Sequence, residues 1–311
     1  MAADGRRTRR GITAAALAAA LLGGLTACGG DGDDAKPGGG LSAALDGVPA
    51  ERADTYLAYV DVARARGLVA ADRKLYGDLE DYGIPELAAA RNEGDDPRDA
   101  FGFTAADVDS SVRIGSTGFR LTGRFDPAAA GPPLERRGWK KGATDGGELW
   151  QDGDARVAVS SSVRSGAFAA EDALPPLGGP ERSLADDPAY RRAVDCLGED
   201  AYLVHLFAGR SGNTLPGVAL YGFGARAAED GTSRERLCVV TESAEAARGV
   251  ADALRPATAG GETFDGVAVE VGDGSEPVVT MEWANSATPV GLRPGRQTAT
   301  HELPRLLAPR G

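Results

Sequence analysis

The first 28 residues constrain this chain most, because they determine which part of it folds and in which compartment. Four arginines come first, at Arg6, Arg7, Arg9 and Arg10. A run of 15 residues rich in Ala, Leu and Gly follows, from Gly11 to Leu25. A membrane-spanning helix needs about 20 apolar residues, whereas a basic segment followed by a shorter apolar run is typical of an export signal. We therefore predict that residues 1–27 are a signal peptide.

The apolar run ends in the sequence Leu25-Thr26-Ala27-Cys28. This tetrapeptide resembles the bacterial lipobox, in which small residues precede an invariant cysteine that becomes the mature N-terminus. The resemblance implies a cut before Cys28 and a thioether bond between its sulfur and diacylglycerol, so Cys28 is the expected lipid-attachment site. The alternative is ordinary secretion with a free Cys28. The arginine pairs leave the export route open between general secretion and the twin-arginine route.

Residues 29–40 (GGDGDDAKPGGG) are rich in Gly and Asp and have no apolar period, so residues 28–41 are expected to be the acylated cysteine and a flexible tether. Removal of residues 1–27 takes away four arginines and one aspartate, which leaves 30 basic and 45 acidic residues and a net charge of -15. Anionic headgroups repel such a chain, so the expected membrane partner is lipid reached through acylated Cys28. The same acidity argues against a nucleic-acid partner.

Cys196 and Cys238 are the two remaining cysteines, 42 positions apart. In an exported chain an even pair of cysteines is expected to form a disulfide. Neither cysteine has a His close in sequence to activate it, and the chain has no C-x-x-C motif of the redox or zinc type. We predict a Cys196–Cys238 disulfide, and we predict no metal site and no cofactor.

The mature chain is long enough for one large domain or two ordinary ones, and its 42% hydrophobic content excludes a fully disordered chain. Thr55 to Val60 is β-branched and aromatic, which indicates a strand with Asp61 capping the following helix; a continuous helix is the competing interpretation. Asp126-Pro127 and Asp187-Pro188 each combine a good N-cap with Pro at the first helical position. Asp152-Gly153 is a strong hairpin signal.

Both halves of the mature chain show two strands, a helix and a hairpin in that order. The helix is expected over 127–137 in the first half and over 243–254 in the second. The segment 171–188, with its Pro, Gly and charged residues, is the expected boundary. We predict an α+β fold of two pseudo-repeated lobes, 42–170 and 171–311, each with a mixed or antiparallel sheet and helices packed on one face.

This layout resembles the lipoproteins of actinobacterial cell envelopes. The points of resemblance are the lipobox, the Gly/Asp tether, ALDGVPA at 44–50, LEDYGIPEL at 79–87 and LCVV at 237–240. The preference for Arg over Lys, together with heavy Ala and Gly use, is typical of a GC-rich genome. The resemblance implies a location in the cell envelope and no particular chemistry.

The motifs of catalysis are incomplete in this sequence. His205 lies in AYLVHLF, where the alternation groups it with apolar strand residues, and His301 lies near the C-terminus without a second His at zinc-protease spacing. No G-x-S-x-G motif occurs. Gly222-Phe223-Gly224 begins a loose dinucleotide-binding pattern, yet the chain continues into a turn and another strand, which favours a hairpin. Carboxylates such as Glu93 and Asp95 are expected on the solvated surface.

Three hypotheses follow for the function. The first is a non-catalytic binding or interaction module held at the membrane, whose partner is an unidentified protein or small molecule. The second is a lipid-anchored enzyme that uses carboxylates from separate loops. The third is a solute-binding subunit of a transporter, which predicts two doubly wound lobes, and the strand-rich pattern of this sequence disfavours it.

Overall fold

The computed structural model describes residues 39–169, 173–209, 215–228, 232–259, 264, 266–284, 305 and 307–308. These residues belong to the second of two compact units, which spans residues 36–311. The predicted signal peptide, Cys28, most of the tether and His301 lie outside the described residues. Among the residues described, no helix is both long and apolar enough to cross a membrane.

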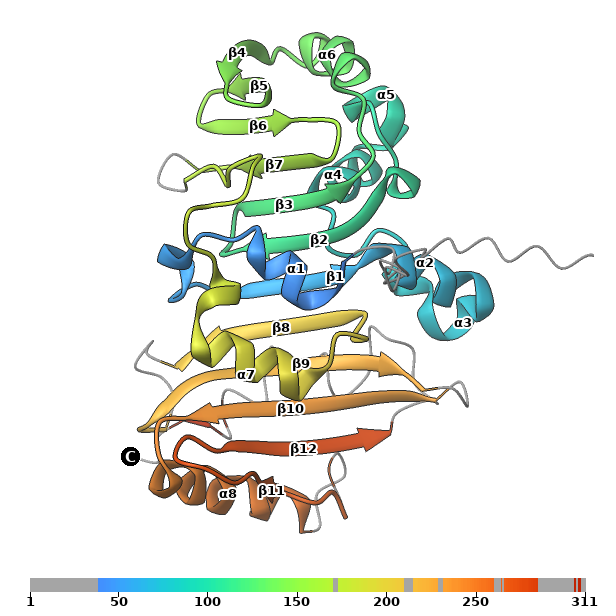
Figure 1. Ribbon diagram of the computed structural model, residues 1–311. Helices are drawn as coiled ribbons and strands as arrows, with labels where there is room; N and C mark the ends of the chain where they lie inside the picture. Colours follow the sequence, from blue (N-terminus) through green and yellow to red (C-terminus); the bar gives the residue numbers. More distant parts are fainter. Residues whose placement is uncertain are drawn as a thin grey trace, which may run out of the picture. The chain divides into compact units, whose positions relative to one another are not determined.

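A twelve-stranded sheet forms the centre of this unit (Figure 1). Its order is β11-β12-β10-β9-β8-β1-β2-β3-β7-β6-β5-β4. The first half of the chain supplies β1 (Leu57–Asp61), β2 (Val108–Ile114), β3 (Gly118–Gly123), β4 (Lys140–Thr144), β5 (Gly147–Asp152), β6 (Ala155–Val159) and β7 (Val163–Ala167). The second half supplies β8 (Leu203–Ala208), β9 (Val218–Ala227), β10 (Ser233–Thr241), β11 (Glu270–Val271) and β12 (Val278–Ala284).

The ladders between these strands are all antiparallel. The predicted α+β class with antiparallel pairing is therefore confirmed. A doubly wound solute-binding subunit would have parallel sheets, so this pairing argues against the third hypothesis. The two halves of the chain meet where β1 pairs with β8, from Leu57↔Leu206 to Val60↔Leu203, and the segments predicted as two lobes share one sheet.

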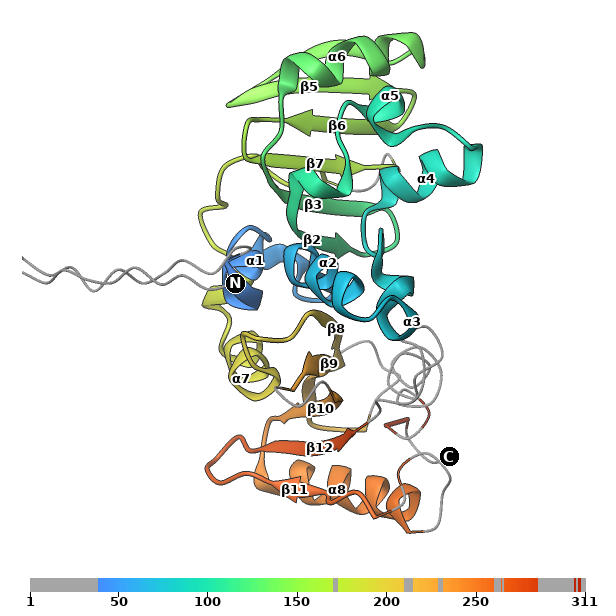
Figure 2. The same cartoon turned by 90° about the vertical axis from the view of Figure 1, so that its right-hand side faces the viewer.

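Helices pack on both faces of the sheet, which corrects the prediction that they cover one face (Figure 2). One face carries α2 (Val62–Ala71), α3 (Arg73–Tyr76), α4 (Pro85–Glu93), α5 (Pro97–Phe101), α6 (Pro127–Arg136) and α8 (Ala244–Thr258). The other carries α1 (Gly40–Asp46) and α7 (Pro188–Leu197). The reason lies in the central strands: all five residues of β1 are buried, so both of its faces need a cover.

The helix starts follow the predicted caps. Asp61 ends β1 and accepts a hydrogen bond from the Arg64 backbone N–H at 2.8 Å, so the strand interpretation of Thr55 to Val60 is confirmed. Asp126 and Asp187 cap α6 and α7 in the same way. The side chain of Ser243 caps α8, which begins one residue later than predicted. Such a cap satisfies one of the N–H groups that a helix leaves unpaired in its first turn.

The predicted disulfide is present and joins α7 to β10. The Cα atoms of Cys196 and Cys238 are 6.2 Å apart. Gly222 and Gly224 of β9 lie beneath the same helix, where an added Cβ would stand 2.9 and 3.1 Å from the methyl carbons of Leu197. These glycines let α7 approach the sheet closely, and β9 pairs with β10 as the predicted hairpin. The Gly-x-Gly pattern thus has a packing role here.

Candidate binding cleft

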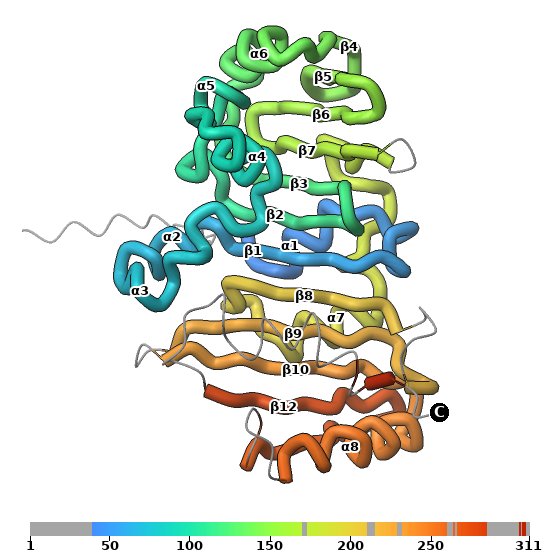
Figure 3. Tube along the Cα trace, turned by 180° about the vertical axis from the view of Figure 1, so that it is seen from behind, coloured from blue at the N-terminus to red at the C-terminus, as the bar shows by residue number. Residues whose placement is uncertain are grey.

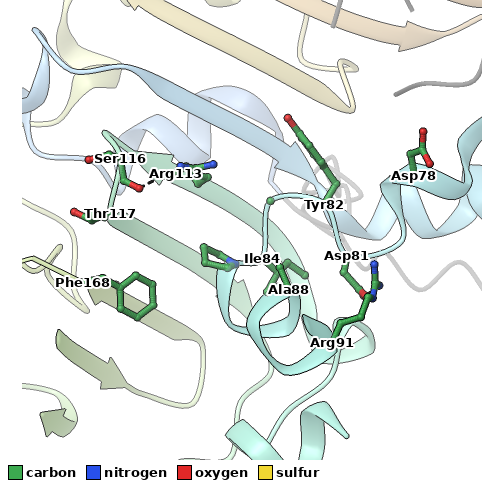
Figure 4. Close-up of a pocket in the computed structure, with 13 residues that line it drawn as sticks. Asp78, Asp81, Tyr82, Ile84, Ala88, Arg91, Arg113, Ser116, Thr117 and Phe168 are labelled. Atoms are coloured by element: carbon green, nitrogen blue, oxygen red, sulfur yellow. Dashed lines mark hydrogen bonds and ion pairs between the residues drawn. The ribbon is translucent and has the colours of Figure 1, made fainter. Parts of the chain in front are cut away.

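A cleft of about 420 Å³ opens on the face that carries α4, beside the turn between β2 and β3 (Figure 4). Three separate segments line it: residues 78–91 around the start of α4, residues 113–118 of the β2–β3 turn, and Phe168 after β7. In the sheet β2, β3 and β7 are consecutive neighbours, which brings the last two segments together (Figure 3).

Phe168 is the exposed large hydrophobic residue among the described residues that line the cleft. Its side chain is 38% exposed, whereas large hydrophobic side chains elsewhere in the described chain are mostly buried. It is nevertheless held in place, because its backbone N–H donates to the Thr117 carbonyl at 3.2 Å and its ring centroid lies 5.4 Å from that of buried Phe119. Ile84, Pro85 and Ala88 continue the apolar lining. An exposed aromatic ring held in a fixed position is suited to contact a ligand.

The loop before α4 is tied to the sheet at Gly83. The backbone φ of Gly83 is 85°, and an added Cβ would lie 2.7 Å from Cγ2 of Val60. The Ser111 hydroxyl of β2 donates to the Gly83 carbonyl at 2.5 Å. A residue with a side chain would be strained there and would push the loop off the sheet. The wall formed by Ile84 and Pro85 is therefore fixed before any ligand binds.

Two arginines contribute charge to the cleft, and they differ in their partners. Arg91 forms an ion pair with Asp81, so its charge is compensated. Arg113 donates from Nη2 to the Ser116 carbonyl at 3.2 Å and forms no ion pair with any residue of the described chain. The remaining N–H groups of the half-buried Arg113 guanidinium are thus available to an anion.

A buried ion pair joins α4 to β7, the two elements next to which parts of the cleft wall lie. Arg164 of β7 donates to Glu86 of α4 from Nε at 2.7 Å and from Nη2 at 2.6 Å. Both side chains are only 1% exposed, and the guanidinium carbon lies 4.7 Å from the centroid of the Phe103 ring. The two parallel hydrogen bonds fix the orientation of α4 relative to β7. Pro85 and Ala88 flank Glu86 in sequence, so this pair positions part of the cleft.

A second cavity, of about 610 Å³, lies on the opposite face beside the disulfide and β11. Its charges are largely satisfied within the protein. Glu282 accepts from Arg226 Nη2 at 2.9 Å and from Arg236 Nε at 2.7 Å, and Arg234 lies 3.5 Å away. Arg236 also donates to the Cys196 carbonyl at 2.7 Å. This cluster cross-links β9, β10, β12 and α7, which indicates a structural role.

Glu282 should make the stability of this region depend on pH. Partial burial raises the pKa of this carboxyl, but the hydrogen bond and charge of Arg236 and the charges of Arg226 and Arg234 outweigh it, so the pKa is lowered overall. A lowered folded-state pKa means that the stabilisation is present above the unfolded value of about 4.3 and is lost as pH falls through the folded value.

We expect Glu282→Gln to lower the free energy of unfolding at neutral pH, and we expect the difference from wild type to shrink as the pH falls below about 4. Urea unfolding followed from neutral to acidic pH measures both quantities. Glu270→Gln, which alters a carboxylate lining the same cavity but outside this ion-pair cluster, is the matched control. A difference that stays constant across the titration would contradict the assigned charge network.

His205, Glu93 and Asp95, which the sequence offered as catalytic candidates, do not line the cleft. His205 is buried in β8, and its Nδ1 lies 2.6 Å from the Tyr56 hydroxyl. Glu93 and Asp95 are exposed and pair with Arg137. Within the described residues, no group of three or more His, Cys, Asp or Glu is placed to hold a metal ion.

Only one of the three segments that line the cleft had a recognisable signal in the sequence. LEDYGIPEL at 79–87 supplies the loop and the start of α4, whereas Arg113 and Phe168 carried no motif. A polar strand, β7, brings Phe168 to the cleft, and its five residues VRSGA lack the alternation that predicts a strand. The cleft is therefore a product of the sheet order.

Comparisons with known proteins do not assign this chain to a family. No protein-family model and no curated protein sequence matches it. A solved structure, crystal form I of TP0453, is similar with a TM-score of 0.41 and 12% identity, over 85% of this chain and 98% of that one. A likeness of this degree carries no argument about function.

Proposed function

We propose that this protein is a cell-envelope lipoprotein, anchored through Cys28, whose α+β domain binds a ligand or partner at the extracytoplasmic face of the cytoplasmic membrane. The observation that carries the proposal is the order of the N-terminal signals: four arginines, a 15-residue apolar run and Leu25-Thr26-Ala27-Cys28. The disulfide between Cys196 and Cys238 supports it, because such bonds persist mainly in oxidising compartments outside the cytoplasm.

The fixed walls of the cleft support a binding role. Its lining combines an apolar surface with a few polar groups, which is the usual composition of a small-molecule site. The Gly83 loop and the Glu86–Arg164 pair hold those walls in the absence of any ligand. Asp81, one of the two carboxylates among the described residues that line the cleft, is engaged by Arg91. Binding without catalysis is the role that this arrangement favours.

The proposed anchor is the lipid, because the negative charge of the protein gives it no electrostatic attraction to an anionic membrane surface. Each buried CH₂ of an acyl chain contributes about 0.8 kcal/mol, so two chains give stable attachment where one gives only reversible binding. After removal of residues 1–27 the chain has a net charge of -15, and an anionic membrane surface repels it.

Replacement of the lipid-attachment cysteine tests the location. We expect wild-type protein to be cut before Cys28 and to partition into detergent. Cys28→Ser has no sulfur for the thioether, so it should keep its precursor length or appear in the medium after cleavage elsewhere. Phase partitioning and mass spectrometry of the N-terminus measure both outcomes. Cys196→Ser, which removes a different sulfur, should partition as wild type does. Retention of Cys28→Ser at the wild-type level with correct cleavage would refute the lipid anchor.

A further inference from the structure

We propose that the cleft between the β2–β3 turn and α4 binds an organic acid with one carboxylate and a small apolar body. This inference rests on the binding role proposed above and names the ligand class for the same site. It is carried by the pairing of an uncompensated arginine with an exposed aromatic ring in one preformed cavity.

The charge of Arg113 selects an anion. Of the two arginines among the described residues that line the cleft, Arg91 is paired with Asp81, and Arg113 is the one without a carboxylate partner. Its planar guanidinium presents parallel N–H groups that match the two oxygens of a carboxylate. Partial burial in the cleft strengthens that interaction, because water screens it less than at an open surface.

The remaining charges limit the ligand to one negative charge. Arg91 is neutralised by Asp81, and Asp78 also lines the cleft, so a second anionic group would meet carboxylates and no free cation among the described lining residues. A phosphate monoester, which carries close to two charges at neutral pH, is therefore disfavoured. A monocarboxylate fits the single uncompensated charge of Arg113.

The apolar residues that line the cleft indicate that the rest of the ligand is apolar. Arg113 and Phe168 both line the cleft and lie apart from one another in Figure 4, so one molecule can place its carboxylate on Arg113 and its apolar part against Phe168. The volume of about 420 Å³ lies at the low end of the range for small-molecule sites, roughly 300–1,000 Å³. The site therefore fits a small molecule and is small for a folded partner.

Titration of the full-length lipoprotein in detergent with 3-phenylpropanoate tests the proposal. We expect saturable binding by calorimetry, and we expect the neutral 3-phenylpropanamide to bind about tenfold more weakly or worse, because it lacks the charge that Arg113 recognises. Octanoate is the second probe. Tighter binding of octanoate than of 3-phenylpropanoate would identify the body as an acyl chain, and the reverse order would identify it as aromatic.

Variants assign the binding to the cleft. Arg113→Gln should weaken 3-phenylpropanoate binding about tenfold or more, and Arg113→Lys should bind with intermediate affinity because it keeps the charge and loses the bidentate geometry. Phe168→Ala should weaken it severalfold with little change in thermal stability, since this side chain is 38% exposed. Arg191→Gln, the same change at an exposed position on the opposite face, is the matched control and should bind as wild type does.

Three results would overturn the inference: no saturable binding of either carboxylate at millimolar concentration, equal affinity for acid and amide, or wild-type affinity in a folded Arg113→Gln protein. These failures are separable from failure of the anchor. Loss of carboxylate binding with intact detergent partitioning refutes the ligand class alone. Carboxylate binding by a protein that needs no Cys28 for retention refutes the anchor alone.

Discussion

Glu86→Gln should destabilise the protein by roughly 3–5 kcal/mol, because it removes one member of a fully buried ion pair and leaves the other uncompensated. Glu86 and Arg164 are each 1% exposed, and Arg164 directs two hydrogen bonds at the carboxylate. The amide of Gln would place a donor against a guanidinium that can only donate. Urea unfolding at neutral pH measures the loss.

The matched control is Glu80→Gln in the pair between Arg73 and Glu80. Those side chains are 71% and 47% exposed, so this change should alter the free energy of unfolding by less than about 1 kcal/mol. A double variant, Glu86→Leu with Arg164→Met, removes both charges and should be less destabilised than Glu86→Gln. Equal losses in Glu86→Gln and Glu80→Gln would show that burial of the pair has no energetic consequence.

The same pair connects stability to ligand binding. It joins α4 to β7, and Pro85, Ala88 and Phe168 lie within a few residues of its two members. A shift of α4 against β7 would therefore change the distance between the apolar wall and Phe168. The positions of the walls depend on an interaction outside the cleft, as preorganised sites generally require.

The signals that predicted the elements correctly are local. Asp61, Asp126 and Asp187 each cap a helix through a hydrogen bond to an N–H two or three residues further along the chain. The hairpin predicted from Asp152-Gly153 is present: Asp152 pairs with Ala155, so Gly153 and Asp154 form the two-residue turn between β5 and β6, and Gly153 has a φ of 58°. Such features depend on neighbouring residues alone and can be read from one sequence.

The order of the sheet depends on distant pairing, and here sequence reasoning failed. β3 pairs with β7 across the intervening strands β4, β5 and β6, and no local pattern encodes that partnership. β7 holds Arg164, Ser165 and Gly166, residues that do not favour a strand. Each has a tertiary reason: Arg164 meets Glu86, Ser165 donates to the Pro175 carbonyl, and an added Cβ on Gly166 would lie 2.2 Å from the Phe119 ring.

The second large effect concerns the disulfide that joins α7 to β10. The bond closes a loop of 42 positions, and the chain-entropy account gives about 4 kcal/mol for a loop of that size. We expect Cys196→Ser to lose most of this stabilisation, which corresponds to a fall in the melting temperature of about 10 °C. Differential scanning calorimetry of the exported protein with and without reductant measures it.

The expected pattern across variants separates the bond from the packing around it. Cys238 is fully buried between the sheet and α7, whereas Cys196 is only partly buried, so Cys196→Ser removes the bond with little change in the core. Reductant should lower the melting temperature of wild type to that of Cys196→Ser and leave the variant unchanged, because the variant has no bond to break.

Digestion without reduction should yield linked peptides carrying Cys196 and Cys238 from wild type. Two separately alkylated peptides from the native exported protein, or a reductant effect of equal size in Cys196→Ser, would be incompatible with the bond.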